Sequence, residues 1–337
     1  MGTSIPLTPS EAPASTALLP ASRALAGVWR RTLAFIIDAC ILGLPAAVLA
    51  VPFFDFLSRL APWAKLIGFC IALPYFAILD SRIGGGQTLG QRLLAVEVVD
   101  ASGQNISFGK SLLRYFIFAV PYFLNRLELS QSGTPAIVLW ATSLIIFGVG
   151  GSTFYLMLFN RHSRQGLHDL AVGSYVVDAH DYGPVAARPI WPTHRTIMAT
   201  LVLILVGTTM YFEHSLEGRV PFAQLLLDQA AIEKMPQVRT VGLSDMRNLN
   251  NGETQHVLGV SVAWTGKVED EQKFADEVAR FLLENDPTAQ DYERIQIVLW
   301  RGYDLGIANS QVSHTFAHTP EEWKARFTGE PASSNQK

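Results

Sequence analysis

The sequence predicts an α-helical membrane bundle of about five transmembrane helices, followed by a small soluble α+β domain. Of the 337 residues, 49% are hydrophobic and only 16% are charged, whereas an ordinary soluble domain has roughly 25% charged residues. The mean hydropathy is positive, at +0.23. Five segments approach the roughly 20 apolar residues that a spanning helix needs, and mixed helix and strand patterns follow the last of them.

The candidate spans are 32–53, 62–79, 112–129, 134–159 and 196–213. The third is the least apolar, because it contains Arg114, Pro121 and Arg126. If this segment lay in the membrane interface instead of crossing the bilayer, every later segment would be reversed.

Basic residues indicate the orientation of these spans. With the N-terminus in the cytoplasm, the segments on the cytoplasmic side hold many more arginines and lysines than the two short outer loops. This distribution follows the positive-inside rule. Five crossings then place the C-terminal domain outside the cytoplasm.

The remaining chain divides by composition. A proline-rich tail, 1–22, is expected to be disordered, and a membrane domain with four spans covers 23–180. A linker, 181–195, leads into the fifth span at 196–213, and a tail at 329–337 is also expected to be disordered. Between the fifth span and the C-terminal tail lies an α+β domain, 220–328, which we expect on the outer side of the membrane.

Periodicity predicts the elements of the soluble parts. In the α+β domain, strands are expected at 256–264 and 293–300. A helix at 268–286 places Phe274, Val278, Phe281 and Leu282 on one face. In the membrane domain, two segments at 95–99 and 174–177 alternate apolar residues, and we expect them to pair as a small cytoplasmic sheet.

Three charged residues lie in or beside apolar spans, where a charge is expensive: Arg31, Asp38 and Asp80. Arg31 and Asp38 share a helical face, about 10 Å apart along the axis. Because the second span returns Asp80 to the depth of Arg31, we expect these two to pair. Asp38 would then need Arg30, Arg114, a bound proton or water.

Other patterns argue against several classes of function. The net charge of −3 and the lack of a dense basic run argue against nucleic acid as a partner. Gly85 and Gly90 have the spacing of a phosphate loop, but Gln91 and Arg92 stand where that motif has Lys and Ser or Thr. We therefore expect the glycines at 84–86 to form a flexible tight turn and not a nucleotide site. Histidines after the fourth span lack a metal-binding spacing, and Ser310, with His314 and His318, lacks a nucleophile elbow. We therefore expect no enzyme, no cofactor and no metal.

The sequence resembles a known family in three places: WRRTLAFIID, LDSRIGGGQTLGQRLLAVEVVD and RQGLHDLAVGSYVV. These resemble the RDD family of bacterial integral membrane proteins, over about residues 26–177. The resemblance implies a bacterial cytoplasmic (inner) membrane location and a transport or ion-exchange role. It also implies that Arg31, Asp38 and Asp80 are the arginine and two aspartates that give the family its name. Its other motif residues match Gly85, Gly90, Arg92, His168 and Asp169, the last two as interfacial hydrogen-bonding residues, while Gln91 replaces the lysine of the usual Gly-Lys-Arg.

Two hypotheses for function follow. In the first, the bundle transports a monovalent cation or a proton, with Asp38 titrating, Arg31 tuning it and Asp80 at the cytoplasmic mouth. In the second, the charged residues only lock the helices together, and the chain is a non-catalytic anchor or assembly protein whose outer domain binds an envelope partner. Formation of a homo-oligomer in the lipid bilayer would be compatible with both.

Overall fold

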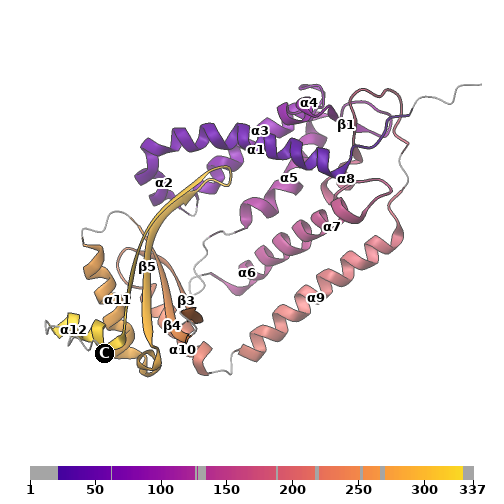
Figure 1. Cartoon of the computed structure of the whole chain (residues 1–337). Helices are drawn as coiled ribbons and strands as arrows, with labels where there is room; N and C mark the ends of the chain where they lie inside the picture. Colours follow the sequence, from indigo (N-terminus) through magenta and orange to yellow (C-terminus); the bar gives the residue numbers. More distant parts are fainter. Residues whose placement is uncertain are drawn as a thin grey trace, which may run out of the picture.

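The computed structural model describes residues 22–61, 63–125, 127, 134–186, 189–216, 220–250, 253–265 and 270–328. The tails expected at 1–22 and 329–337 fall outside these ranges, except for Ser22. The chain forms a bundle of helices and a C-terminal region that contains a sheet (Figure 1). This arrangement agrees with the predicted division into a helical bundle and an α+β region.

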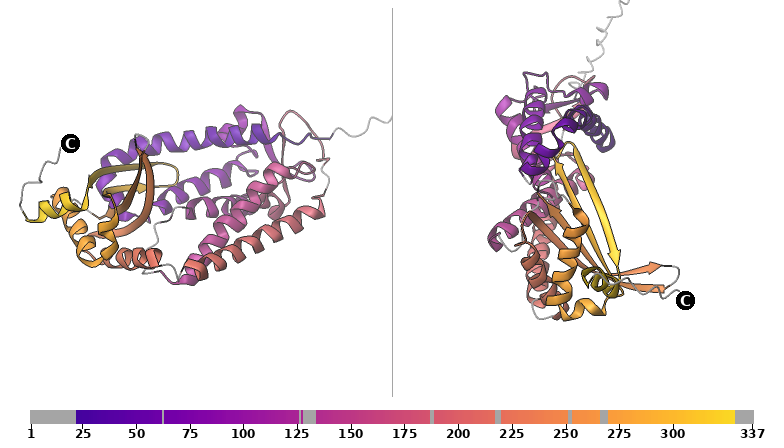
Figure 2. Two further views of the ribbon diagram at one scale, coloured as in Figure 1. Left: turned by 60° about the horizontal axis from the view of Figure 1, so that its bottom comes forward. Right: turned by 90° about the vertical axis from the view of Figure 1, so that its left-hand side faces the viewer.

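Long apolar helices form the bundle and run between two ends of the molecule (Figure 2). One end carries a small two-stranded sheet and the other carries the C-terminal region, and we call them the sheet end and the domain end. The bundle helices are α1 (Val28–Ala50), α2 (Phe54–Leu60), α3 (Ala64–Leu79), α5 (Phe108–Leu124), α6 (Ala136–Ser143), α7 (Gly151–Phe159) and α9 (Pro192–Leu216). A 3-10 turn, Val51–Phe53, joins α1 to α2, and a π-helical stretch, Leu144–Gly150, joins α6 to α7.

Within the described residues, three helical stretches are long and apolar enough to cross a membrane: Val28–Leu60, Ala136–Phe159 and Pro192–Tyr211. Helix α3 is apolar but has 16 residues, and α5 has 17 residues that include Lys110 and Arg114. Large apolar side chains on α1 and α9 face outward, as expected for contact with lipid. The predicted membrane character is therefore supported, whereas length and composition support three of the five predicted spans.

The sheet end is built from loops between the helices. Strands β1 (Val96–Asp100) and β2 (Ser174–Asp178) pair antiparallel, with Val98 opposite Val176. The predicted pairing of these two segments is confirmed. Two short helices, α4 (Leu89–Leu93) and α8 (Leu167–Val172), lie just before the strands. The sheet thereby ties the chain that follows α3 to the chain that follows α7.

The C-terminal region is a four-stranded sheet with helices packed on it. Its strand order is β3-β4-β5-β6, with β4 and β5 parallel and the other neighbours antiparallel. The elements are α10 (Val220–Ile232), β3 (Val238–Asn250), β4 (Glu253–Trp264), α11 (Glu271–Asn285), η3 (Pro287–Asp291), β5 (Arg294–Asp304), β6 (Asn309–His318) and α12 (Pro320–Thr328).

The predicted strands correspond to β4 and β5, and the predicted amphipathic helix is α11. Val278 and Leu282 of α11 are fully buried in the core between helix and sheet, and Phe274 and Phe281 pack at its margin. Strands β3 and β6 were not predicted, because polar residues interrupt the apolar alternation in both.

Candidate functional site: a buried ion-pair network

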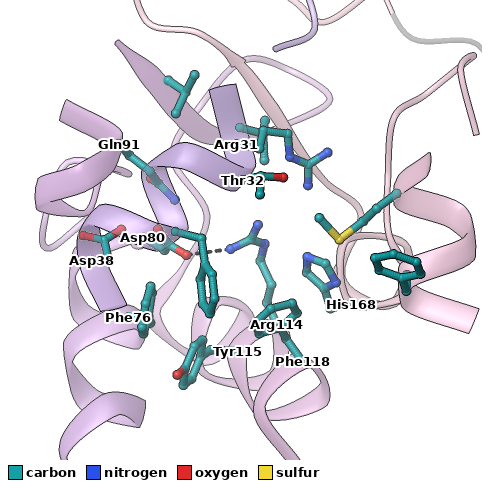
Figure 3. A pocket seen from close by; sticks show the side chains of 15 residues that line it. Arg31, Thr32, Asp38, Phe76, Asp80, Gln91, Arg114, Tyr115, Phe118 and His168 are labelled. Carbon is teal, nitrogen blue, oxygen red and sulfur yellow. Dashed lines mark hydrogen bonds and ion pairs between the residues drawn. The ribbon is translucent and has the colours of Figure 1, made fainter. Parts of the chain in front are cut away.

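A cavity of about 330 Å³ lies near the sheet end of the bundle. Its wall combines aromatic side chains with charged groups that come from α1, the end of α3 and α5, and with His168 of α8 (Figure 3). Five of the predicted site residues line it: Arg31, Asp38, Asp80, Arg114 and His168. The fold therefore brings together side chains that are more than 80 positions apart in the sequence.

Asp169 is the centre of the ion pairs. It lies in the first turn of α8 and is fully buried. Its Oδ2 accepts a 2.6 Å bond from Arg31 Nη2, and its Oδ1 accepts a 2.8 Å bond from Arg114 Nε. The Gly166 amide and the Ser174 hydroxyl donate at 3.2 Å. Four donors thus satisfy both carboxylate oxygens, as burial of a charge requires.

Burial and charge act in opposite directions on Asp169. Burial disfavours the carboxylate, but the neighbouring basic groups outweigh this and hold the pKa of Asp169 well below its usual range. Burial also lowers the pKa of His168 to about 3, so that imidazole is neutral near pH 7. The two arginines therefore carry the effect, and Asp169 stays ionised.

Arg114 links Asp169 to Asp80. Its Nη1 donates a 2.6 Å bond to Asp80 Oδ2 while its Nε contacts Asp169. Asp80 stands directly after the last residue of α3 and is 1% exposed. Burial raises the pKa of Asp80 to about 6, although Arg114 and, to a smaller extent, the side chain of Gln91 oppose the shift.

The second oxygen of Asp80 is the unsatisfied atom of the network. Oδ1 is buried and has no hydrogen-bond partner of normal geometry among the described residues. The amide of Gln91 lies above the Asp80 carboxylate (Figure 3) and is close enough to influence its pKa. Asp80 therefore has one firm partner, Arg114, and one oxygen that faces a neutral amide without a well-formed bond.

Asp38 has a different environment. Its Oδ1 accepts bonds from the Tyr75 hydroxyl at 2.7 Å and the Gly90 amide at 2.8 Å, and its Oδ2 accepts one from the Thr88 hydroxyl at 2.5 Å. These donors are neutral. Of the expected partners of Asp38, the two arginines are not used, because Arg30 pairs instead with Asp178 at 2.7 Å and Arg114 pairs with the other two aspartates.

The predicted pair of Arg31 and Asp80 is also wrong. Arg31 donates to Asp169 and to the Arg164 carbonyl, and Arg114 takes Asp80. Helix–helix packing decides this, since α5 packs directly against α3 and α8 and brings Arg114 between the two aspartates. Asp169 is hydrogen-bonded, as predicted, and is buried at the centre of the network, while its place at the membrane interface stays a prediction.

The loop that contains Gly84, Gly85, Gly86 and Gly90, here called the glycine-rich loop, holds the donors for Asp38 in place. Gly85 and Gly86 have positive φ angles of 77° and 71°, which glycine adopts without strain. Thr88 caps α4 in a capping box with Gln91, and Arg92 donates a 2.7 Å bond to the Gly84 carbonyl. A Cβ on Gly90 would overlap the Ala34 carbonyl oxygen of α1. The loop is therefore a turn that docks on α1, in agreement with the tight turn that the sequence predicts.

Sequence reasoning missed Tyr75 and Thr88 as partners of Asp38. It also missed the edge-on contact of neutral His168 with Phe118, whose ring centroids lie 5.2 Å apart. The Nδ1 atom of His168 has no partner among the described residues. The one signal in the sequence was the run of glycines soon after Asp80, which indicates a tight turn able to fold back onto the spans.

Comparison with known proteins supports the resemblance seen in the sequence. The RDD family model matches residues 25–173, the part of the chain that contains the arginines and aspartates of the network. The chain is also similar to the uncharacterized protein YxaI of Bacillus subtilis (strain 168), with 27% identity over 173 residues. That match covers 45% of this chain and 96% of YxaI. No solved structure matches the chain significantly.

Proposed function

We propose that this chain is a multipass membrane protein of the RDD type that exchanges protons or monovalent cations across the bilayer, with Asp80 as the exchanging group. The observation that carries this proposal is Oδ1 of Asp80, which is buried and lacks a well-formed hydrogen bond among the described residues. A buried carboxylate oxygen without a donor is costly. A proton or a cation bound from the cavity would remove that cost.

Comparison of the three aspartates favours Asp80 over Asp38. Asp169 accepts four bonds, two from arginines, and Asp38 accepts three from neutral donors. Asp80 accepts one. The sequence-based hypothesis that Asp38 titrates is therefore replaced by one in which Asp38 holds the glycine-rich loop.

The charge balance of the network supports the same site. Three carboxylates, Asp38, Asp80 and Asp169, face two guanidinium groups, Arg31 and Arg114, so one negative charge is left over when all are ionised. His168 is neutral and does not offset it. One bound proton or one monovalent cation would restore neutrality.

We place the protein in a bacterial inner membrane with the sheet end in the cytoplasm and the C-terminal region outside. The arginines and lysines of the loops support this orientation, because those of the sheet end outnumber those of the short loops at the domain end. The cavity then lies on the cytoplasmic side of the bundle.

Flux in proteoliposomes tests the proposal. The purified full-length protein is reconstituted with a pH-sensitive dye inside, and Na⁺ or K⁺ is added outside. We expect a cation-driven pH change with the wild type and its loss, by at least tenfold in rate, with Asp80→Asn.

Asp178→Asn is the matched control, since Asp178 lies at the same end but pairs with Arg30 outside the cavity. It should retain the wild-type rate. Equal rates for Asp80→Asn and the wild type would contradict the proposal, as would a wild type that moves neither protons nor cations.

A partner-binding role is the second candidate. Strands β3 and β6 are the two edges of the four-stranded sheet, and each pairs with a single strand among the described residues. Exposed edges can accept a strand from another protein. Crosslinking of the full-length protein in intact cells tests this role, which fails if no specific partner is retained.

A further inference from the structure

The hairpin of β5 and β6 extends beyond the core of its own domain. The core between the sheet and its helices includes Leu299 of β5, but Tyr303, Leu305 and Ala308 belong to a cluster with residues of α1, α2 and α3. Figure 1 shows the hairpin reaching from the sheet to these helices. We call its turn, 304–308, the hairpin tip.

The tip is a tight turn with fixed geometry. The Leu305 amide donates to the Ala308 carbonyl at 2.8 Å, and the Gly306 amide donates to Asp304 Oδ1 at 2.7 Å. Gly306 has a φ angle of 77°, which favours glycine. The turn is therefore held by its own hydrogen bonds where it lies against the bundle.

Two glycines on the bundle helices make room for this turn. A Cβ on Gly68 of α3 would overlap the carbonyl oxygen of Leu305, and one on Gly43 of α1 would lie 2.6 Å from the carbonyl oxygen of Ile307. The atoms nearest to both positions belong to the hairpin and not to another helix. These glycines thus accommodate the backbone of the C-terminal region inside the bundle.

The hairpin tip packs against Gly43 and Gly68, and we call this place on the bundle helices its seat. Polar contacts surround the seat. The Tyr122 hydroxyl of α5 donates to the Gly306 carbonyl at 2.8 Å, and Lys65 Nζ lies 3.2 Å from Asp304 Oδ2. Further out, Arg301 pairs with Asp55 at 2.6 Å, and the Asp55 side chain is 70% exposed. The exposed Arg301–Asp55 pair can be exchanged for water at modest cost, whereas Lys65 is buried and its pair with Asp304 is the costlier contact to break.

An aromatic cluster that contacts the tip also lines the cavity. Ile307 packs against the cluster of Ala72, Phe76, Tyr115, Ala119 and Phe123. Phe76 and Tyr115 stack with ring centroids 4.3 Å apart, and both also line the cavity. The hairpin tip therefore lies on the path from the cavity to the domain end.

We propose that the hairpin tip is a displaceable plug, which closes the domain end of the bundle and gives the C-terminal region control over the cavity. The juxtaposition that carries this inference is the turn of Leu305 to Ala308 against Gly43 and Gly68. Control of flux rests on the proposed exchange function, whereas the displacement of the tip does not. The experiment therefore measures both.

The test uses full-length protein in which Cys40 and Cys70 are replaced by alanine and Ala308→Cys is added. Ala308 is buried in the seat, and cysteine differs little from it in size. Gly68→Ala should expel the tip by steric overlap. We expect the thiol introduced at position 308 to react at least tenfold faster with a membrane-impermeant maleimide, together with at least a threefold rise in cation-driven proton flux.

Gly207→Ala in α9 and Gly151→Ala in α7 are matched controls, because a Cβ at either position would have no neighbouring atom within 4 Å. They should change neither the labelling rate at position 308 nor the cation-driven proton flux. Unchanged labelling in Gly68→Ala would overturn the displacement, and faster labelling without a change in flux would overturn the plug. If the wild type carries no flux, the proposed function fails, while the labelling still decides whether the tip leaves its seat.

A second pair of variants covers the case in which Gly68→Ala does not fold. Lys65→Cys and Asp304→Cys are introduced together and joined by a short cleavable bis-thiol reagent. Joining should lower the flux by at least threefold, and cleavage should restore it. Flux that is the same before and after joining would contradict the plug.

Discussion

Two buried aspartates that look equivalent in the sequence differ in the groups around them. Asp38 accepts three neutral donors, whereas Asp80 has one cationic donor and one oxygen without a well-formed bond among the described residues. The sequence correctly indicated that Arg31 and Asp80 lie at one end of the bundle with Asp38 nearby. It could not give the pairs, because each pair depends on the rotation and approach of separate helices.

The pH dependence of stability should report on Asp80. Its pKa in the folded protein is raised to about 6 from an ordinary value of 3.8, so the folded state binds more protons than the unfolded state between these values. Stability contributed by Asp80 is therefore fully present below about pH 4 and is lost as the pH rises through about 6. Arg114, Asp38 and Asp169 are the charged groups around it.

Thermal unfolding in detergent, measured from pH 4 to pH 7, checks this dependence. Subtracting the curve of Asp80→Asn from that of the wild type isolates the contribution of Asp80. A difference that stays flat across this range would contradict the raised pKa.

Asp169→Asn should be the most destabilising aspartate substitution in the network. It leaves Arg31 and Arg114 buried with a weaker acceptor, and breaking a buried ion pair costs about 3–5 kcal/mol. Asp38→Asn should cost less, about 1–3 kcal/mol, since its donors are neutral. Reversible unfolding in mixed micelles measures both, and the reverse order would contradict Asp169 as the centre of the network.

At the scale of elements, the small sheet and the glycine-rich loop were predictable because their signals are local. Alternating valines identified β1 and β2, and consecutive glycines identified the turn. The insertion of the β5–β6 hairpin was not predictable, since polar residues of β6 hide its strand pattern. Nothing local marks Gly43 and Gly68 as contacts of a distant turn.

The docking of the loop on α1 gives a prediction at this scale. Gly90→Ala should push α4 away from α1, because its Cβ would overlap the Ala34 carbonyl oxygen and lie 3.0 Å from the Asp38 carboxyl carbon. Overpacking of this kind costs about 1–3 kcal/mol. Gly109→Ala, whose Cβ would meet no atom within 4 Å, should leave the unfolding free energy nearly unchanged in the same assay.

At the scale of the whole molecule, the helices carry the chain between the sheet end and the domain end (Figure 2). The proposed orientation places the domain end outside the cell. A cysteine introduced at Ser310 of β6, with Cys40 and Cys70 replaced, should then react with an impermeant thiol reagent in intact cells. Reaction only after lysis would place the C-terminal region in the cytoplasm and reverse the orientation.

The most direct test of the account is the protonation of Asp80 itself. Infrared difference spectroscopy of the reconstituted protein detects the carbonyl band of a protonated carboxyl group as the pH is lowered. We predict a band that titrates near pH 6, disappears in Asp80→Asn, persists in Asp178→Asn and weakens when a monovalent cation competes with the proton. A band that persists in Asp80→Asn, or the absence of any band that titrates in this range, would contradict the central claim.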